Sequence, residues 1–182
     1  MNYEGQICRG PMERSSYMLP VAVGCSYNRC KFCTLFRHLK YRELPMEQIE
    51  AELERVRSLG GNPKHVFLGD GNAFGLATKR LLEITDLIHR YFPGCQAINM
   101  DGTITNIQAK SREELLALRK AGICHLYLGI ESGLDDVLRY MGKDHNLDQA
   151  YRQIDRIQRA GFMFDAHIMT GIAGHCLLYT SP

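Results

Sequence analysis

The sequence predicts an α/β protein in which parallel β-strands alternate with α-helices. Short apolar segments rich in β-branched residues recur along the chain, and helical patterns fill the gaps between the later ones. From the second strand on, the strands start at intervals of about thirty residues, the period expected of βα units. Such alternation implies a parallel sheet with right-handed crossovers. The periodicity alone is compatible with a partial βα barrel and with an open doubly wound sheet.

The first helix follows from the spacing of apolar residues between 46 and 59. Ile49, Leu53 and Val56 recur every three to four residues, and Gly60 ends the run. A second apolar pattern predicts a helix around 81–88 that is closed before Pro93. The predicted strands are residues 17–23, 65–68, 96–100, 125–130 and 162–169.

Two later helices begin at capping boxes. In the first, Ser111 is followed by Glu114 and then by an apolar run, and in the second Asn146 is followed by Gln149. A short polar side chain followed three residues later by Glu or Gln satisfies backbone N–H groups that a helix start leaves unpaired. We therefore predict helices from 112 and from 147 onward.

Composition excludes several functional classes. The chain has 182 residues, 45% of them hydrophobic and 23% charged, with a net charge of +2, which is ordinary for one soluble domain. This charge indicates no particular polyanionic partner. No apolar run reaches the length of a membrane span, and the N-terminus lacks a signal-peptide core. The seven cysteines without a secretory signal favour a reducing, cytoplasmic location.

Three cysteines, Cys25, Cys30 and Cys33, stand within one short stretch after the first predicted strand. Thiolates packed this closely bind a metal or an iron–sulfur cluster, since a disulfide would leave one over. Three ligands leave one iron of a four-iron cluster open to a small molecule. Two alternatives are a zinc module completed by Cys8 or His38 and an iron–sulfur electron carrier, both without catalysis.

The stretch resembles the cysteine motif of the radical SAM superfamily, in which an aromatic residue such as Phe32 precedes the last cysteine. The usual spacing is three and then two residues, whereas here it is four and then two, as in a similar subset with a Gly-Cys-Ser-His/Tyr-Asn-x-Cys-x-Phe-Cys pattern. The resemblance implies a partial (β/α)6 TIM-like barrel, truncated after about the fifth strand. It also implies that Cys25, Cys30 and Cys33 hold a 4Fe–4S cluster.

The resemblance further implies a reaction. The cluster would cleave S-adenosylmethionine (SAM) to methionine and a 5′-deoxyadenosyl radical, which abstracts hydrogen from an unidentified substrate. The electron would come from a flavodoxin or a ferredoxin. No acid or base from the protein is needed for this cleavage, and no Ser/His/Asp or Cys/His arrangement is present in the sequence.

Glycines and polar residues that could form a site follow each predicted strand. Reactive groups gather at these carboxyl ends in parallel βα folds. After the second strand come Gly69, Asp70, Gly71 and Asn72. The resemblance places them at the methionine amino group of SAM, with glycine allowing close approach and Asp70 or Asn72 accepting a hydrogen bond. A plain strand-to-loop turn is the alternative.

Leu128-Gly-Ile-Glu-Ser-Gly133 ends the fourth predicted strand and is more specific. It resembles a motif of cobalamin-independent radical SAM proteins that act on tRNA and porphyrin-like substrates. Glu131 or Ser132 is then placed to hold ribose hydroxyls. The alternative is structural, with Ser132 as the N-cap of a helix whose first turn carries Asp135 and Asp136.

Three further residues are assigned by resemblance alone. Asn99 ends the third strand and would face the cofactor, and Lys143 would meet its carboxylate. Gly171 opens the motif Gly171-Ile-Ala-Gly174, whose backbone would pack against adenine.

The basic run 37–42 makes a nucleic-acid substrate possible, although a solvated loop beside the cluster is the favoured interpretation. We predict an N-terminal extension at 1–16 and an incomplete barrel core at 17–174, with an open edge between the first and fifth strands. Residues 175–182 resemble translated adapter sequence and are predicted to be non-native, a natural short tail being the alternative.

Overall fold

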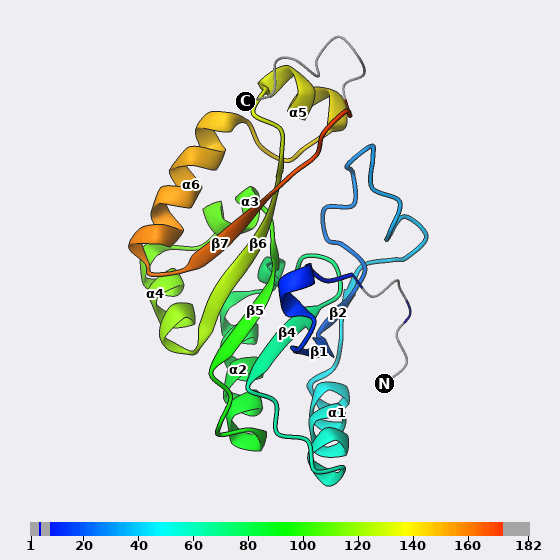
Figure 1. The fold of residues 1–182 in the computed structure, drawn as a ribbon, viewed down its shortest axis with the longest axis vertical. Helices are drawn as coiled ribbons and strands as arrows, with labels where there is room; N and C mark the ends of the chain where they lie inside the picture. The colour runs from blue at the N-terminus through cyan, green and yellow to red at the C-terminus, as the bar shows by residue number, and fades with distance from the viewer. Residues whose placement is uncertain (1–3, 5–7, 173–182) are drawn as a thin grey trace.

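A computed structural model describes residue 4 and residues 8–172 of the chain. Its main sheet has five parallel strands, in the order β1-β4-β5-β6-β7 (Figure 1). Each strand pairs with the next one along the chain, so the order never reverses as it does in a doubly wound sheet. The topology is therefore that of a barrel wall, which confirms the predicted fold class. Within the described residues, β1 and β7 form the two edges. The strands are β1 (Tyr17–Pro20), β4 (His65–Gly69), β5 (Ala97–Gly102), β6 (Ile123–Glu131) and β7 (Met163–Ile168).

Four long helices connect the strands and cover one face of the sheet, as Figure 1 shows. Short elements lie elsewhere: η1 packs on the opposite face, and α3 and α5 follow the carboxyl ends of β5 and β6. The long helices are α1 (Met46–Ser58), α2 (Thr78–Tyr91), α4 (Arg112–Lys120) and α6 (Leu147–Arg159). The short ones are η1 (Pro11–Glu13), η2 (Ala73–Gly75), α3 (Ile104–Gln108) and α5 (Asp135–Met141).

The two faces of the sheet differ in chemistry. On the helix-covered face, strand residues such as Leu19, Leu68 and Leu126 are fully buried in one large apolar core with the helices. Burying each such side chain contributes roughly 1.5–3 kcal/mol. The other face, which we call the inner face, carries a small cluster of Met18, Phe67 and Tyr127. The register also places Asn99 and Asp101, beside His125 and Tyr127 of β6, on the inner face.

The first predicted strand is divided between two sheets. After β1, the backbone N–H of Val21 donates to the carbonyl of Gly69 (2.7 Å), while the Val21 carbonyl accepts from Leu44 (3.0 Å). The chain then forms β2 (Ala22–Val23), which pairs antiparallel with the unpredicted β3 (Arg42–Glu43). This two-stranded ribbon closes the base of the segment 24–41, which contains the three cysteines and is called the cysteine loop below.

The predicted capping boxes are confirmed at both helix starts. Ser111 Oγ accepts from the N–H of Glu114 (3.2 Å), and Asn146 Oδ1 accepts from Gln149 (2.9 Å). Ser132, in contrast, is not a helix N-cap. The helix begins at Asp135, after Leu134, and Ser132 Oγ instead accepts from the N–H of Leu134 (3.2 Å) within the preceding turn. No helix of the described residues is long and apolar enough to cross a membrane.

The predicted extension 1–16 includes η1, which packs on the inner face through Glu13. The predicted tail 175–182 lies outside the described residues.

Candidate active site

The cysteine loop presents Cys25, Cys30 and Cys33 as half-buried thiols, and the six cysteines that the structure describes are all free. The backbone N–H of Cys33 donates to the carbonyl of Cys30 (3.2 Å), which makes a tight turn. Arg37 clamps this turn by donating to the carbonyls of Cys33 (3.0 Å) and Cys30 (2.6 Å). Burial raises the pKa of the Cys30 thiol, and the nearby Lys143 ammonium opposes that shift.

In the part of the chain that the structure describes, no three His, Cys, Asp or Glu side chains converge as metal ligands. The donor set itself suits an iron–sulfur cluster, because three free thiols lie on one loop beside a cation that favours thiolates. Cys8, the ligand weighed for a zinc site, is exposed.

The loop after β4 docks on the cysteine loop. Gly71 has φ of +61°, and a Cβ atom there would lie 2.2 Å from the carbonyl oxygen of Gly24. Only glycine permits this approach. Asn72 is buried, and its Oδ1 accepts from the N–H (3.3 Å) and the hydroxyl (3.0 Å) of Ser26, with the Cys25 thiol at 3.7 Å. Gly71 and Asn72 thus contact the cysteine loop itself.

Gly69 and Asp70 behave differently from their neighbours. A Cβ atom on Gly69 would make only ordinary contact with Met18, at 3.4 Å. Asp70 is buried, and no residue in the described ranges is seen to hydrogen-bond its carboxyl group. Burial, helped by Glu4, raises the pKa of this carboxyl group. Asp70 therefore has an acceptor to offer at the carboxyl end of β4, whereas the Asn72 oxygen is already engaged.

Glu131 and Lys143 form a buried ion pair at the end of β6. Lys143 Nζ lies 3.5 Å from Glu131 Oε1, with 4% and 10% of the two side chains exposed. Glu131 has φ of +73°, in a region that residues other than glycine seldom adopt, and the ladder to β7 shifts register beside it. Lys143 Nζ also lies 6.0 Å from the centre of the Phe32 ring. Three predicted residues from distant segments thus meet here.

Beside Phe32 lies a cavity of about 320 Å³ lined by Lys31, Phe32, Tyr140, Met141 and Ile172. Its lining is largely apolar and includes two rings. Gly171 precedes the cavity residue Ile172 and has φ of +77°. The last two residues of its motif, Ala173 and Gly174, lie outside the described residues. Ser132 is buried, and its hydroxyl oxygen accepts from the backbone of the following turn.

Asn99 belongs to a second polar group on the inner face. Its Nδ2 donates to Glu13 Oε1 (2.7 Å), which also accepts from the Tyr127 hydroxyl (2.6 Å), and Ser16 donates to the same carboxylate. Asn99 Oδ1 is buried, and none of the described residues donates a hydrogen bond to it. Burial raises the pKa of Asp101 to about 7, with Glu13 adding to the shift. Asn99 is therefore not gathered with Glu131 and Lys143.

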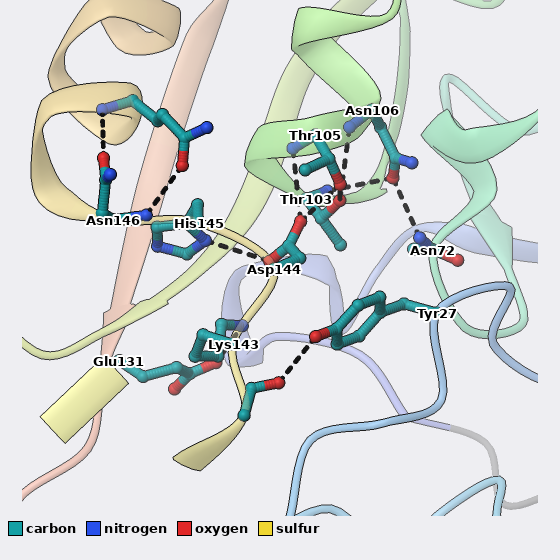
Figure 2. A network of polar contacts seen from close by, with 12 residues as sticks. Tyr27, Asn72, Thr103, Thr105, Asn106, Glu131, Lys143, Asp144, His145 and Asn146 are labelled. Atoms are coloured by element: carbon teal, nitrogen blue, oxygen red, sulfur yellow. Dashed lines mark hydrogen bonds and ion pairs between the residues drawn. The ribbon is translucent and has the colours of Figure 1, made fainter. Parts of the chain in front are cut away.

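Several residues of these groups escaped sequence reasoning. Glu13 and Tyr127 carry no motif, and only tertiary packing brings them together. Asn106 had a readable signal, because Thr103-x-x-Asn106 is a capping pattern that starts α3. Figure 2 shows how Asn106 connects to Asn72 and how Asp144 connects to Thr105.

Comparison with known proteins adds to this geometry. The family model of the radical SAM superfamily matches residues 19–175. The heme chaperone HemW of Bacillus subtilis is 25% identical over 156 residues, covering 84% of this chain and 41% of the relative. The threonylcarbamoyladenosine tRNA methylthiotransferase MtaB of Thermotoga maritima is 26% identical over 172 residues, covering 89% and 38%. The chain thus spans about two fifths of the length of these curated relatives.

Solved structures show the same fold. The cobalamin-dependent radical SAM enzyme OxsB, with aqua-cobalamin and SAM bound, superposes with a TM-score of 0.70 at 18% identity, covering 85% of this chain and 24% of that one. Coproporphyrinogen III oxidase HemN of Escherichia coli gives a TM-score of 0.66 at 14% identity, covering 86% and 37%.

Proposed function

The chain belongs to the radical SAM superfamily, which uses a 4Fe–4S cluster and SAM, and we propose that this chain binds both and cleaves SAM reductively. The observation that carries the proposal is the meeting of Glu131 and Lys143 with Phe32 of the cysteine loop. Two buried charges and a ring of the cysteine loop lie there, with the Lys143 ammonium close enough to act on the Cys30 thiol, at the end of the barrel where βα enzymes bind their ligands.

Cys25, Cys30 and Cys33 would hold three irons and leave the fourth to the amino and carboxylate groups of SAM. When bound, the cluster would pass one electron to SAM, which would split into methionine and a 5′-deoxyadenosyl radical able to take a hydrogen atom from the substrate. We propose a flavodoxin or a ferredoxin as the one-electron donor.

The remaining residues would bind and orient SAM. Lys143 offers an ammonium to its carboxylate, and Glu131 offers acceptors to its ribose hydroxyls. Asp70 suits the amino group better than Asn72, because Asn72 Oδ1 already accepts from Ser26. The cavity beside Phe32 has the apolar, ring-bearing lining that a flat base requires. We further propose that the Gly171 backbone packs against adenine and that Ser132 lies at the ribose hydroxyls. Asn99, on the inner face, would approach the cofactor from the sheet.

The motif Leu128–Gly133 supports a place in the cobalamin-independent group that acts on tRNA or porphyrin-like substrates. We also propose an N-terminal extension at 1–16, a radical SAM core at 17–174, a cytoplasmic location and a substrate that gives up a hydrogen atom. A zinc module or an electron carrier would leave the buried Glu131–Lys143 pair without a role.

The test is anaerobic reconstitution with iron and sulfide, followed by the EPR spectrum of the reduced protein with and without SAM. We expect about four irons per chain and a spectrum that changes when SAM is added. Cys30→Ala should lose the cluster, whereas Cys124→Ala, a half-buried thiol outside the loop, should keep it. Uptake of one zinc, or a cluster whose spectrum ignores SAM, would refute the proposal.

A further inference from the structure

The segment that carries Lys143 is joined directly to the cysteine loop. The Tyr27 hydroxyl donates to the carbonyl of Gly142 (2.7 Å), and the backbone N–H of Lys31 donates to the carbonyl of Met141 (2.8 Å). Gly142 has φ of +67° and ends α5, so the chain turns sharply just before Lys143. These contacts hold the residue on the N-terminal side of Lys143.

The residue on the other side of Lys143 is held from a different element. Asp144 accepts hydrogen bonds from the backbone N–H (3.2 Å) and the hydroxyl (2.5 Å) of Thr105, and from Nδ1 of His145 (3.0 Å). Only 2% of the Asp144 side chain is exposed. Burial acts to raise its pKa, but the hydrogen bonds from His145 and Thr105 and the charge of Lys143 hold the pKa well below its usual range. The carboxylate is therefore ionised and fixed.

The start of α3 connects Asp144 back to the cysteine loop. Thr105 is flanked by the Thr103–Asn106 capping box, and Asn106 Oδ1 accepts from both Thr103 N–H (3.1 Å) and Asn72 Nδ2 (2.9 Å). Asn72 in turn binds Ser26, next to Cys25. Figure 2 shows the part of this network that runs from Asn72 through Asn106 and Thr105 to Asp144. The Lys143 segment and the cysteine loop are thus tied together on two sides.

We propose that Asp144 is a positioning residue for SAM binding. By anchoring the backbone next to Lys143 to the start of α3, Asp144 keeps the Lys143 ammonium beside Glu131 and Phe32. The inference rests on the proposed function for the identity of the ligand. A lysine side chain is long and flexible. Fixing the backbone on both sides of Lys143 reduces the conformational entropy that is lost when the ligand binds. A buried carboxylate is a costly anchor, and its three donors are the reason that it is tolerated here.

The first test needs no cofactor. Thr105→Val removes the hydroxyl donor with little change of shape, Thr105→Ser restores it, and Asp148→Asn removes an exposed carboxylate on the next helix as a control. In hydrogen exchange of the cofactor-free protein, we expect Thr105→Val to speed exchange at least threefold in residues 25–33 and 142–146. Exchange in α2 should stay at the wild-type rate. Faster exchange throughout the chain, or an unchanged exchange rate in residues 25–33, would contradict the coupling between Asp144 and the cysteine loop.

The second test measures SAM binding after reconstitution. For Thr105→Val and Asp144→Asn we expect wild-type iron content with a dissociation constant for SAM raised roughly tenfold, as the loss of one hydrogen bond to a charged group predicts. Thr105→Ser and Asp148→Asn should stay within about twofold of wild type. Equal SAM affinity in all variants would overturn the role of Asp144 alone, whereas a wild-type protein with a full cluster that binds no SAM would overturn the proposed function.

Discussion

Gly129 leaves open the space in which the Glu131 carboxylate lies. A Cβ atom on Gly129 would stand 2.5 Å from Glu131 Oε1 and 3.1 Å from Lys143 Nζ. The absence of a side chain two residues before Glu131 therefore leaves the room in which the buried ion pair lies.

We expect Gly129→Ala to push the Glu131 carboxylate off its present position while leaving the cysteine loop intact. The reconstituted variant should keep its iron and bind SAM at least tenfold more weakly, measured by EPR titration. Gly94→Ala is the matched control, because the one atom that its Cβ would crowd is the end of the flexible Lys64 side chain (Nζ at 2.5 Å), outside the site. Unchanged SAM affinity in Gly129→Ala would show that the Glu131 position does not matter for binding.

Gly71 provides a second prediction, about the support of the cysteine loop. Gly71→Ala combines an unfavourable positive φ with a Cβ atom 2.2 Å from the Gly24 carbonyl oxygen. We expect a loss of roughly 2–4 kcal/mol in the free energy of unfolding, the sum of backbone strain and overpacking, together with reduced iron uptake. Both are measured on the purified chain, by urea unfolding and by iron analysis.

The control for Gly71→Ala is Gly60→Ala. Gly60 also has a positive φ, +79°, but a Cβ atom there would meet nothing within 4 Å. It should lose only the strain, about 1–2 kcal/mol, and keep full iron uptake. Equal losses in the two variants would mean that the contact between Gly71 and Gly24 is not needed to support the cysteine loop.

Local signals predicted most of the fold because they are carried by neighbouring residues. In the capping boxes at Ser111 and Asn146, the two residues that bond to each other are only three positions apart in the sequence. The break of the first strand after Pro20 could not be read in this way, since it depends on the hydrogen bond that Val21 donates to Gly69 and the one that it accepts from Leu44. The choice between a barrel wall and a doubly wound sheet likewise needed the strand order, which no periodicity contains.

Glu131 could be singled out in the sequence as a carboxylate at a strand end, whereas Lys143 was assigned by resemblance alone. The structure places the two side chains 3.5 Å apart, a pairing that neither signal predicted, and their roles toward SAM stay predictions. Asn72 was assigned to the cofactor, yet its oxygen binds Ser26, because a side-chain amide looks the same in sequence whether it binds a ligand or a loop. Glu13 carried no signal at all, since its burial depends on η1 folding onto the inner face.

Asp101 predicts a pH dependence of stability. Its folded pKa of about 7 lies above the usual value near 3.8, so between these values the folded state binds more protons than the unfolded state. The contribution of Asp101 to stability is therefore present at low pH and is lost as the pH rises from about 4 to about 7. In Asp101→Asn this dependence should be absent. The free energy of unfolding of the cofactor-free variant, compared with that of the wild type, should therefore be more favourable to the folded state at pH 8 than at pH 4.5 by on the order of 2 kcal/mol. Urea unfolding at the two pH values measures it, and identical pH profiles for variant and wild type would contradict the burial of this carboxyl group.

Lys143 should also control the reactivity of Cys30 before any cofactor binds. Burial raises the pKa of the Cys30 thiol, and the Lys143 ammonium lowers it, so Lys143→Gln should raise this pKa further and reduce the thiolate fraction at neutral pH. We expect alkylation of Cys30 in the cofactor-free protein, followed by peptide mass spectrometry, to slow severalfold at pH 8. Lys31→Gln is the matched control, since Lys31 lies next to Cys30 in the sequence but its ammonium is directed to the Tyr140 ring, 5.3 Å from the ring centre. Equal slowing in both variants would indicate a general effect of net charge, whereas slowing in Lys143→Gln alone would show that one cation serves both the thiol and the buried Glu131 carboxylate.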